Sequence, residues 1–526
     1  MYELVIGNQE EETDEKKAGS LMKEPVVKTR CGAVRGRYQQ GVATFKGIPF
    51  AAPPVGQRRF AAPVPPQSWD GVREAHAFSP TPPQGDPSSR VMPGLDLRPL
   101  FGEGWRRGQD YLTLNVWTPD PGAHGLPVMV FIYGGAFVAG ASSTPLYDGA
   151  RFACDGVVFV SFNYRLGIEG FLPLHRGATN VGLRDQIAAL TWVQDNIAAF
   201  GGDPNKVTIF GESSGALSVD TLLAVPSATG LFRRAISQSG GGQHTMSIEQ
   251  AARVAARFGE ILGILPTRED FTSLSPEQLI AAQSQLLPGS LDLGTAQDVD
   301  PTGGLTLFLP VRDGDLISTQ PVDAVRRGAS ATVDLLLGTN SQEMNLYYVP
   351  TGVVNLIGSD ENVYQSLRGR HPEPETLVAT YRASRPDALS GELFSAIMTD
   401  WMFHIPTVRL GEAHAPHAGG TYLYEFAWPS PTCGGKLGAC HGLELGFVFD
   451  ALDTPGLTGP NGLVGEHPPG ELARRVHSTW ITFATTGDPG WLPYHTQQRA
   501  VMCINTTWET ITDPHRVERQ AWDGVR

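Results

Sequence analysis

A serine between two glycines is the sharpest chemical feature of the sequence. Residues 207–216 read Val-Thr-Ile-Phe-Gly211-Glu-Ser213-Ser-Gly215-Ala, with an apolar run before the serine and a helix-compatible run after it. A serine hydroxyl is a weak nucleophile that must stand exposed at a sharp strand-to-helix turn, and flanking glycines permit such a turn. The pattern predicts that Ser213 is a nucleophile for acyl transfer, with a structural turn serine as the alternative.

A second glycine-rich turn could stabilise the oxyanion that this reaction forms. Residues 131–137 read Phe-Ile-Tyr-Gly134-Gly135-Ala136-Phe, directly after an apolar run. Small residues let backbone N–H groups approach a developing negative charge. We therefore expect an oxyanion hole formed by the N–H groups of Gly135, Ala136 and Ser214, supported by Gly134. An ordinary loop is the alternative.

A serine nucleophile of this kind also needs an acid and a base, in the chain order Ser, Asp or Glu, His. Of thirteen histidines, His441 stands out because it precedes a glycine and an apolar run. Such a histidine would take the serine proton and return it to the leaving alcohol. Glu343 follows a buried-type strand and a turn, and Asp313 is the rival carboxylate. The residues alone leave the choice between these two open.

Further stretches of the chain match a known family. From about residue 28 to 510, they include Phe-Lys-Gly-Ile-Pro-Phe-Ala-Ala-Pro-Pro-Val-Gly at 45–56, Leu-Thr-Leu-Asn-Val at 112–116, Phe-Asn-Tyr-Arg at 162–165, Asn-Val-Gly-Leu-Arg-Asp-Gln at 180–186, Phe-Gly-Gly-Asp-Pro at 200–204 and Ala-Ile-Ser-Gln-Ser-Gly at 235–240. With these motifs the chain resembles the type-B carboxylesterase family of the α/β-hydrolase fold, which includes bacterial para-nitrobenzyl esterases and, more distantly, cholinesterases.

The resemblance implies both an architecture and a reaction. The expected fold is α/β, with a large, mostly parallel, doubly wound sheet, helices on both faces, and loop and helical insertions over an active-site gorge. The expected reaction is hydrolysis of carboxylic esters through an acyl-enzyme intermediate. The family motifs imply a catalytic triad of Ser213, Glu343 and His441, and they assign Asp313 to a recurrent structural turn.

Three further polar residues receive supporting roles. Glu212, beside the nucleophile, and Ser239 are expected to form a supporting polar network, with solvent-facing residues of the turn as the alternative. Glu444, three residues after the predicted base, is expected to be a structural hydrogen-bonding partner rather than a catalytic group. An aromatic gorge, and with it a preference for apolar or aryl esters, is suggested by four positions: Phe137, Trp401, Phe403 and Phe447. Apolar residues at such positions are more often part of the core than of a pocket.

Strands alternate with helices along the chain, which predicts the doubly wound sheet independently. Strands are predicted at 128–133, 157–164, 207–210, 335–338 and 422–428, and helices at 183–200, 216–223 and 247–262, the last opened by a capping box at Ser247. The regions 63–104 and 288–304 are rich in proline and glycine and are expected to be excursions over the sheet. We expect residues 1–25 to be a flexible leader or an expression-derived segment, and 26–526 to be a single domain.

The amino-acid composition argues against several kinds of binding partner. Lysine and arginine total 40 against 54 aspartate and glutamate residues, a formal net charge of −14, which argues against nucleic acid as a partner. The longest uncharged span, 121–147, is broken by proline and glycine, so no membrane segment is predicted. Five cysteines without CxxC spacing indicate neither a disulfide framework nor a metal site. We expect a cytoplasmic enzyme without cofactor, a monomer or small homo-oligomer, that binds a small ester.

Two alternatives differ from the ester hydrolase. Amides, carbamates and thioesters pass through the same tetrahedral chemistry, so the triad alone does not exclude them as substrates. A non-catalytic binding module on the same fold is the alternative from another functional class, since fold alone does not decide function.

Overall fold

A mixed sheet runs through the centre of the computed structural model, which describes residues 24–86, 92–286, 289–295 and 298–526. Within these residues it has eleven strands, in the order β3 (Arg37–Gln39), β4 (Val42–Pro49), β6 (Thr113–Thr118), β8 (Val158–Phe162), β7 (Leu126–Ile132), β9 (Gly202–Glu212), β10 (Arg234–Gln238), β13 (Asp334–Asn340), β14 (Thr421–Phe426), β15 (Ala500–Ile504) and β16 (Trp508–Thr512). The seven strands from β8 to β15 are parallel, and the strands at both edges pair antiparallel. The predicted α/β class with a mostly parallel sheet is confirmed.

The central strands form where the sequence has short, uniformly apolar runs. Strands β8 and β10 are buried at every position, as expected for a parallel sheet that is covered on both faces. Strand β9 begins at Gly202, five residues before the predicted start. It does so because Gly202 pairs with Leu126 across a register shift that the apolar pattern does not reveal.

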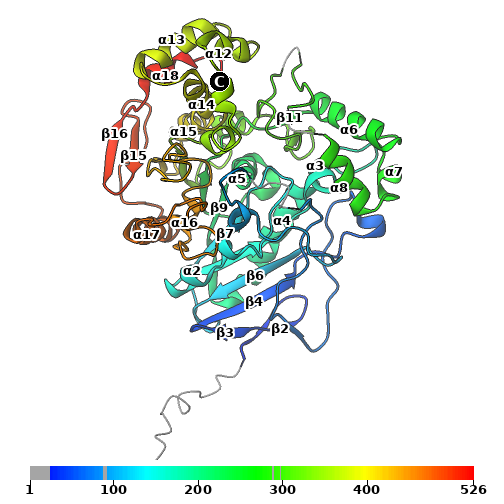
Figure 1. Cartoon of the computed structure of the whole chain (residues 1–526). Coiled ribbons are helices and arrows are strands. Elements are labelled where there is room, and N and C mark those ends of the chain that lie inside the picture. The colour runs from blue at the N-terminus through cyan, green and yellow to red at the C-terminus, as the bar shows by residue number, and fades with distance from the viewer. Residues whose placement is uncertain (1–23, 87–91, 287–288, 296–297) are drawn as a thin grey trace, which may run out of the picture.

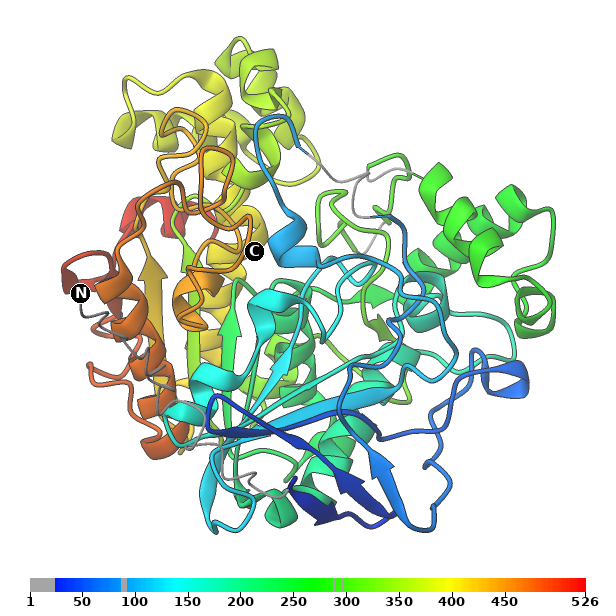
Figure 2. The same ribbon diagram turned by 60° about the horizontal axis from the view of Figure 1, so that its bottom comes forward.

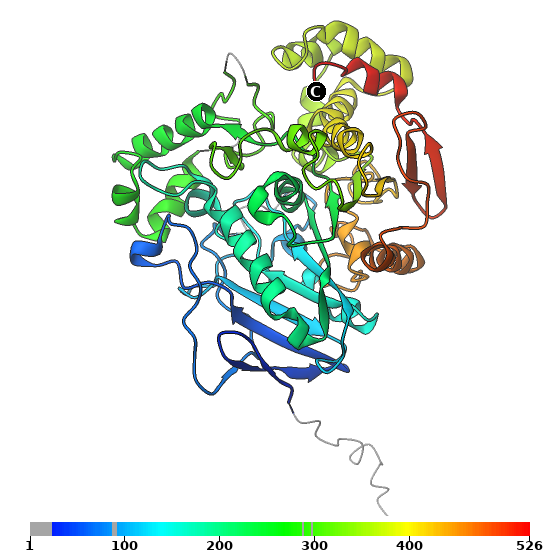
Figure 3. The same ribbon diagram turned by 180° about the vertical axis from the view of Figure 1, so that it is seen from behind.

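Helices cover both sides of the sheet (Figure 1, Figure 2 and Figure 3). Three predicted helices are present as α4 (Val181–Asn196), which continues as a short 3₁₀ helix, α5 (Ser214–Ala224) and α6 (Ile248–Leu262). The capping box of α6 is confirmed, because the Ser247 hydroxyl accepts from the Gln250 N–H and the Gln250 side chain accepts from the Ser247 N–H.

A second group of helices lies beyond the carboxyl ends of the parallel strands and has its own apolar cluster. It comprises α12 (Asp360–Leu367), α13 (Pro374–Ser384), α14 (Ser390–Thr399) and α18 (Arg516–Ala521), drawn in yellow-green and red in Figure 1. Helix α15 (Ile405–His414) begins in this cluster with Ile405, and its later apolar residues Val408, Leu410 and Ala413 belong to the main core. A π-helical turn, η7 (Asp400–His404), joins α14 to α15. Trp401 and Trp522 are buried in this cluster.

The outer parts of the chain are described only in part. Residues 1–23 of the predicted leader lie outside the described residues, and strand β1 (Val26–Lys28) begins just after it. The region 63–104 contributes helix α1 (Arg98–Phe101). The single-domain organisation stays a prediction. Of the helices in the described ranges, none has the length and apolar composition needed to span a bilayer.

Candidate active site

Ser213 lies at the turn between strand β9 and helix α5. Its backbone has φ 56° and ψ −126°, a combination that residues with a side chain rarely adopt. Backbone hydrogen bonds hold the turn on both sides. The Ser213 N–H donates to the Gln238 carbonyl at 2.9 Å, and the Ser213 carbonyl accepts from the Leu217 N–H at 2.9 Å. The serine is therefore held beyond the end of the strand, where it borders a pocket.

Glycines allow this turn to pack closely against the loop after strand β7. A Cβ atom added to Gly215 would lie 2.0 Å from the carbonyl oxygen of Ile132, and one added to Gly211 would lie 2.6 Å from the Gly215 backbone. A Cβ on Gly134 would lie 2.6 Å from the carbonyl oxygen of Glu212. A larger residue at any of these positions would push the turn and the loop apart.

The predicted oxyanion loop lies beside Ser213 and is tied to helix α5. The Phe137 N–H donates to Ser214 Oγ at 3.2 Å, and both Gly135 and Ala136 have positive φ, 112° and 56°. Within the described part of the chain, no acceptor pairs with the backbone N–H groups of Gly135, Ala136 or Ser214. These three donors are thus available to a ligand.

His441 and Glu343 meet although 98 residues separate them. His441 Nδ1 lies 2.7 Å from Glu343 Oε2, and the His441 N–H donates to the Glu343 carbonyl at 3.2 Å. The other carboxylate oxygen, Glu343 Oε1, accepts from the Asn340 N–H at 2.7 Å and from the Ser239 hydroxyl at 2.5 Å. Because the carboxylate is held by three donors, it fixes the orientation of the imidazole.

The second ring nitrogen of His441 faces Glu212. His441 Nε2 lies 3.2 Å from Glu212 Oε1, and both side chains are buried. In the described residues no hydrogen bond joins Nε2 to the hydroxyl of Ser213. Hydrogen bonds between a nucleophile and its base are often long without substrate and shorten when it binds, so this geometry is compatible with proton transfer from Ser213.

The charges of Glu212 and Glu343 determine the direction in which the pKa of the His441 imidazole shifts. Burial lowers the pKa of His441, but the charges of Glu212 and Glu343 outweigh it and raise the pKa to about 9. Burial raises the pKa of Glu212 to about 8, although the neighbouring His441 opposes the rise. The group that would act as base therefore holds its proton more tightly than an ordinary histidine.

Glu444 lies behind this pair. Its Oε1 accepts from Gln238 Nε2 at 3.0 Å and its Oε2 accepts from Asn340 Nδ2 at 2.6 Å. Burial raises the pKa of Glu444, and these two hydrogen bonds oppose the rise. The contacts agree with the expected structural role, because they join strand β10, strand β13 and the loop that carries His441.

The solvent-facing alternative for Glu212 and Ser239 is wrong. The two residues are 5% and 1% exposed, because Glu212 is covered by the loop of His441 and Ser239 lies beneath Glu343. Asp313 lies in a separate turn, where it accepts hydrogen bonds from Asn180 Nδ2 at 2.9 Å and from the backbone N–H groups that follow it. Among the described residues it has no contact with His441.

A cavity of about 310 Å³ opens in front of these groups. Most of its wall is apolar, and the ionisable side chains among its described lining residues are those of Glu212, His441, Tyr147 and Tyr347. It is lined by Met92, Leu97, Leu100, Phe101, Gly134, Gly135, Ala136, Tyr147, Glu212, Ser213, Leu346, Tyr347, His441, Gly442 and Leu445. The expected excursion 63–104 thus contributes the first four wall residues.

The aromatic residues suggested from the sequence do not line this cavity. Phe137, Trp401, Phe403 and Phe447 are all buried in the apolar clusters. They lie in helices and loops whose apolar side chains pack into these clusters. The actual wall residues Leu100, Leu346 and Tyr347 were missed, because an apolar side chain has the same sequence signature in a wall as in a core.

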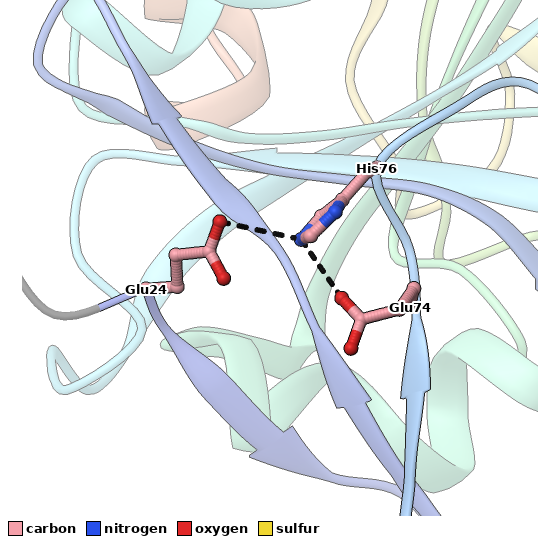
Figure 4. A group of neighbouring side chains, drawn as sticks. All are labelled: Glu24, Glu74 and His76. Atoms are coloured by element: carbon pink, nitrogen blue, oxygen red, sulfur yellow. Dashed lines mark ion pairs between the residues drawn. The ribbon is translucent and has the colours of Figure 1, made fainter.

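A surface cluster of one histidine and two glutamates has residue types that can bind a metal ion. Figure 4 shows His76 between Glu24 and Glu74, with His76 Nε2 3.7 Å and 3.2 Å from their carboxylates. The Arg35 guanidinium already contacts Glu74 at 2.6 Å and Glu24 at 3.9 Å, and both carboxylates are about half exposed. The cluster is therefore a surface ion-pair network, and it carries no metal assignment.

The arrangement can support acyl transfer. It combines a serine at a strained turn, an imidazole held by a carboxylate, and three uncommitted N–H donors in the serine turn and the adjacent loop. These are the nucleophile, the base with its orienting acid, and the oxyanion donors of the serine-hydrolase mechanism.

Known proteins resemble the chain over nearly its whole length. A family model described as the carboxylesterase family matches residues 23–522. The para-nitrobenzyl esterase of Bacillus subtilis (strain 168) is 38% identical over 512 residues, which cover 95% of this chain and 98% of that protein. The phenmedipham hydrolase of Pseudarthrobacter oxydans is 34% identical, with 89% and 91% covered. The structure of a Geobacillus stearothermophilus carboxylesterase superposes with a TM-score of 0.82 at 37% identity, covering 94% of this chain and 99% of that one.

Proposed function

The chain belongs to the carboxylesterase family, has the α/β-hydrolase fold and is a carboxylic ester hydrolase; from this premise we propose that it hydrolyses apolar or aryl esters through an acyl-enzyme on Ser213. One observation carries the proposal. The 2.7 Å hydrogen bond between His441 and Glu343 lies at the cavity that Ser213 borders. Membership of an enzyme family supports catalysis over the non-catalytic binding module.

In the proposed mechanism, Ser213 Oγ attacks the ester carbonyl while His441 Nε2 accepts its proton. Glu343 keeps the imidazole in place and stabilises the imidazolium. The N–H groups of Gly135, Ala136 and Ser214 stabilise the oxyanion, and each donor of this kind is worth about 10²–10³ in rate. His441 then protonates the leaving alcohol, and a water activated by the same nitrogen releases the acid.

The wall of the cavity supports an apolar substrate. Six of its lining residues are leucine, methionine or phenylalanine, and among the described lining residues none is a lysine or arginine that would bind an anionic group. Above about pH 8, where Glu212 is ionised, its charge would further disfavour a negatively charged ester by repulsion. Esters of apolar acids with aryl or alkyl alcohols fit these properties.

The experiment that tests this function is a series of para-nitrophenyl esters, from acetate to laurate, beside para-nitroanilides of the same acids. We expect ester turnover throughout the short and medium chains, loss of turnover in Ser213→Ala, and little activity on anilides. Activity on the anilides with none on the esters would replace the esterase by an amidase that uses the same residues.

The wall also supports a prediction about the alcohol. A Cβ on Gly442 would lie 3.5 Å from Glu212 Oε1 and 3.6 Å from Leu100 Cδ1, so Leu100 lies on the side where His441 would protonate the leaving group. Leu100→Ala should therefore raise kcat/KM for esters of bulky alcohols about tenfold relative to methyl esters. Leu356→Ala, at an 80% exposed position, is the matched control. An unchanged ratio in Leu100→Ala would contradict this assignment.

A cytoplasmic location and a monomeric or small homo-oligomeric state are also proposed. The sequence has only five cysteines, an odd number, and such sparse cysteine usage is typical of proteins in a reducing compartment, which supports the location. Light scattering of the purified protein tests the oligomeric state.

A further inference from the structure

An aromatic ring packs against the imidazole of His441. The centroid of the Phe403 ring lies 4.6 Å from that of His441 with an angle of 34° between the planes, and Phe403 is 2% exposed. The hydrogen bond to Glu343 fixes one end of the imidazole, at Nδ1. Phe403 limits how far the ring can tilt about that bond. The position of Phe403 therefore influences where Nε2 points.

Phe403 lies in the π-helical turn η7 (Asp400–His404). A π-helical turn carries one residue more than an α-helical turn, so it turns the following side chains to a different direction, and such turns are frequent at functional sites. On the side of the sheet, His404 Nδ1 lies 3.3 Å from the hydroxyl of Thr339 in strand β13. The position of Phe403 therefore depends on the contacts that hold the opposite side of this turn.

The opposite side is held by Arg526, whose side chain enters the helical cluster. Its Nε donates to the Trp401 carbonyl at 2.9 Å, and its guanidinium lies 4.3 Å from the centroid of the Trp401 ring. Its Nη2 donates to the Pro301 carbonyl at 2.8 Å and to His244 Nε2 at 3.1 Å. Arg526 is 7% exposed, and no carboxylate in the described residues forms an ion pair with it.

Trp522 adds a second contact to the same turn. Its ring lies 5.7 Å from that of Trp401, and its Nε1 donates to the Tyr381 hydroxyl at 2.9 Å, which in turn donates to Asp400. The segment from α18 to Arg526 therefore contacts the first two residues of η7, directly or through Tyr381. In Figure 1 and Figure 3 the end of the chain lies among the helices of this group.

Burying a cation that forms no close ion pair is costly, and only the more distant charge of Asp300 offsets this cost for Arg526. Arg526 nevertheless makes three directed hydrogen bonds, one of them to the Trp401 carbonyl in η7. We propose that Arg526 is a positioning residue for His441: it holds the Trp401 carbonyl and so fixes the π-helical turn from which Phe403 packs against the imidazole. This inference rests on the proposed function, in which His441 is the general base.

The test is a double-mutant cycle between Arg526→Met and Phe403→Leu. Each single variant should lower kcat for a para-nitrophenyl ester about tenfold, because small displacements of a base have effects of this order or larger, and KM should stay within about twofold. If Arg526 acts through Phe403, the double variant should be no slower than Phe403→Leu alone.

The control is Arg385→Gln. Arg385 anchors the same segment, through Glu518 at 2.9 Å and the Tyr381 ring at 5.3 Å, but among its contacts in the described part of the chain none is with η7. We expect this variant to keep kcat even where its melting temperature falls. If Arg526→Met does not fold, Arg526→Lys, which keeps one donor, takes its place with the same expected fall in kcat at constant KM.

Three results would overturn the proposal: wild-type kcat in the Arg526 variant, losses that multiply in the double variant, or an equal loss in Arg385→Gln. Labelling of wild-type Ser213 by an organophosphonate is measured in parallel. Failure of that labelling would refute the proposed function itself, whereas normal labelling with an unchanged Arg526 variant would refute only the positioning role.

Discussion

The imidazole of His441 lies between two buried carboxylates, 2.7 Å from Glu343 and 3.2 Å from Glu212. These two neighbours have different expected roles. Glu343 also accepts hydrogen bonds from a backbone N–H and from Ser239, so it is suited to orient the ring. In the described residues, Glu212 Oε1 has no hydrogen-bond partner, so it acts on the ring through its charge.

The role of Glu343 as the carboxylate of the triad can be tested by removing its charge. Glu343→Gln should lower kcat by about 10³–10⁴-fold, because an amide favours the wrong tautomer of the imidazole, while the melting temperature changes little. Steady-state kinetics and a thermal melt check it. Asp313→Asn is the comparison, and it should keep near-normal turnover because Asp313 only caps a remote turn. The reverse pattern would show that Glu343 is the wrong carboxylate.

The raised pKa of His441 also predicts how kcat/KM depends on pH. His441 is a base only when neutral, and its pKa is raised to about 9, so kcat/KM should climb with pH through the alkaline range. Glu212→Gln removes one of the two charges that raise this pKa. The acid limb of the kcat/KM profile should therefore move to lower pH by about one unit or more. A limb that stays in place, or moves to higher pH, would contradict the assigned influence of Glu212.

At the scale of elements, the site depends on two turns that follow parallel strands, β7 with its glycine loop and β9 with the nucleophile. Both turns were predictable, because their glycines and the apolar runs before them are local in sequence. His441 could be singled out from the glycine and the apolar run that follow it, and the family resemblance strengthened that assignment. Glu343 depended on the resemblance, since residues alone did not separate it from Asp313. The contact of Glu212 with His441 was not predictable, because it depends on how the β9–α5 turn meets a loop more than two hundred residues away.

The prediction at this scale tests the packing of the turn. Gly215→Ala should lower the free energy of unfolding by more than about 2 kcal/mol and reduce esterase activity, because its Cβ would lie 2.0 Å from the Ile132 carbonyl oxygen. Chemical denaturation measures the change. Gly358→Ala, where a Cβ meets open space, should stay within about 0.5 kcal/mol of wild type. Equal stability of the two variants would refute the close packing.

At the scale of the whole molecule, the mostly parallel sheet was predictable from the alternation of strands and helices. The path of the segment from α18 to Arg526 into the helical cluster was not, because buried arginines have no local signature. The net charge of −14 excludes little by itself. Together with a cavity in which no lysine or arginine is found among the described lining residues, the net charge has a consequence for charged substrates.

That consequence is a salt dependence. A para-nitrophenyl ester with a free carboxylate should have a higher KM than a neutral ester of the same size, because the negative field of the protein repels it. Raising the ionic strength from about 0.02 M to 0.5 M should lower that KM by screening the field. The KM of the neutral ester is the internal control and should barely change. A salt-independent KM for the anionic ester would contradict this account.

The central claim is that Ser213 is the nucleophile, and covalent labelling tests it most directly. The wild-type enzyme is treated with a fluorophosphonate, and the intact mass and the labelled peptide are measured. We predict one adduct per chain, located on Ser213, absent in Ser213→Ala and slowed strongly in a His441→Ala variant. An active wild-type enzyme that acquires no adduct, or carries it on another residue, would contradict the account.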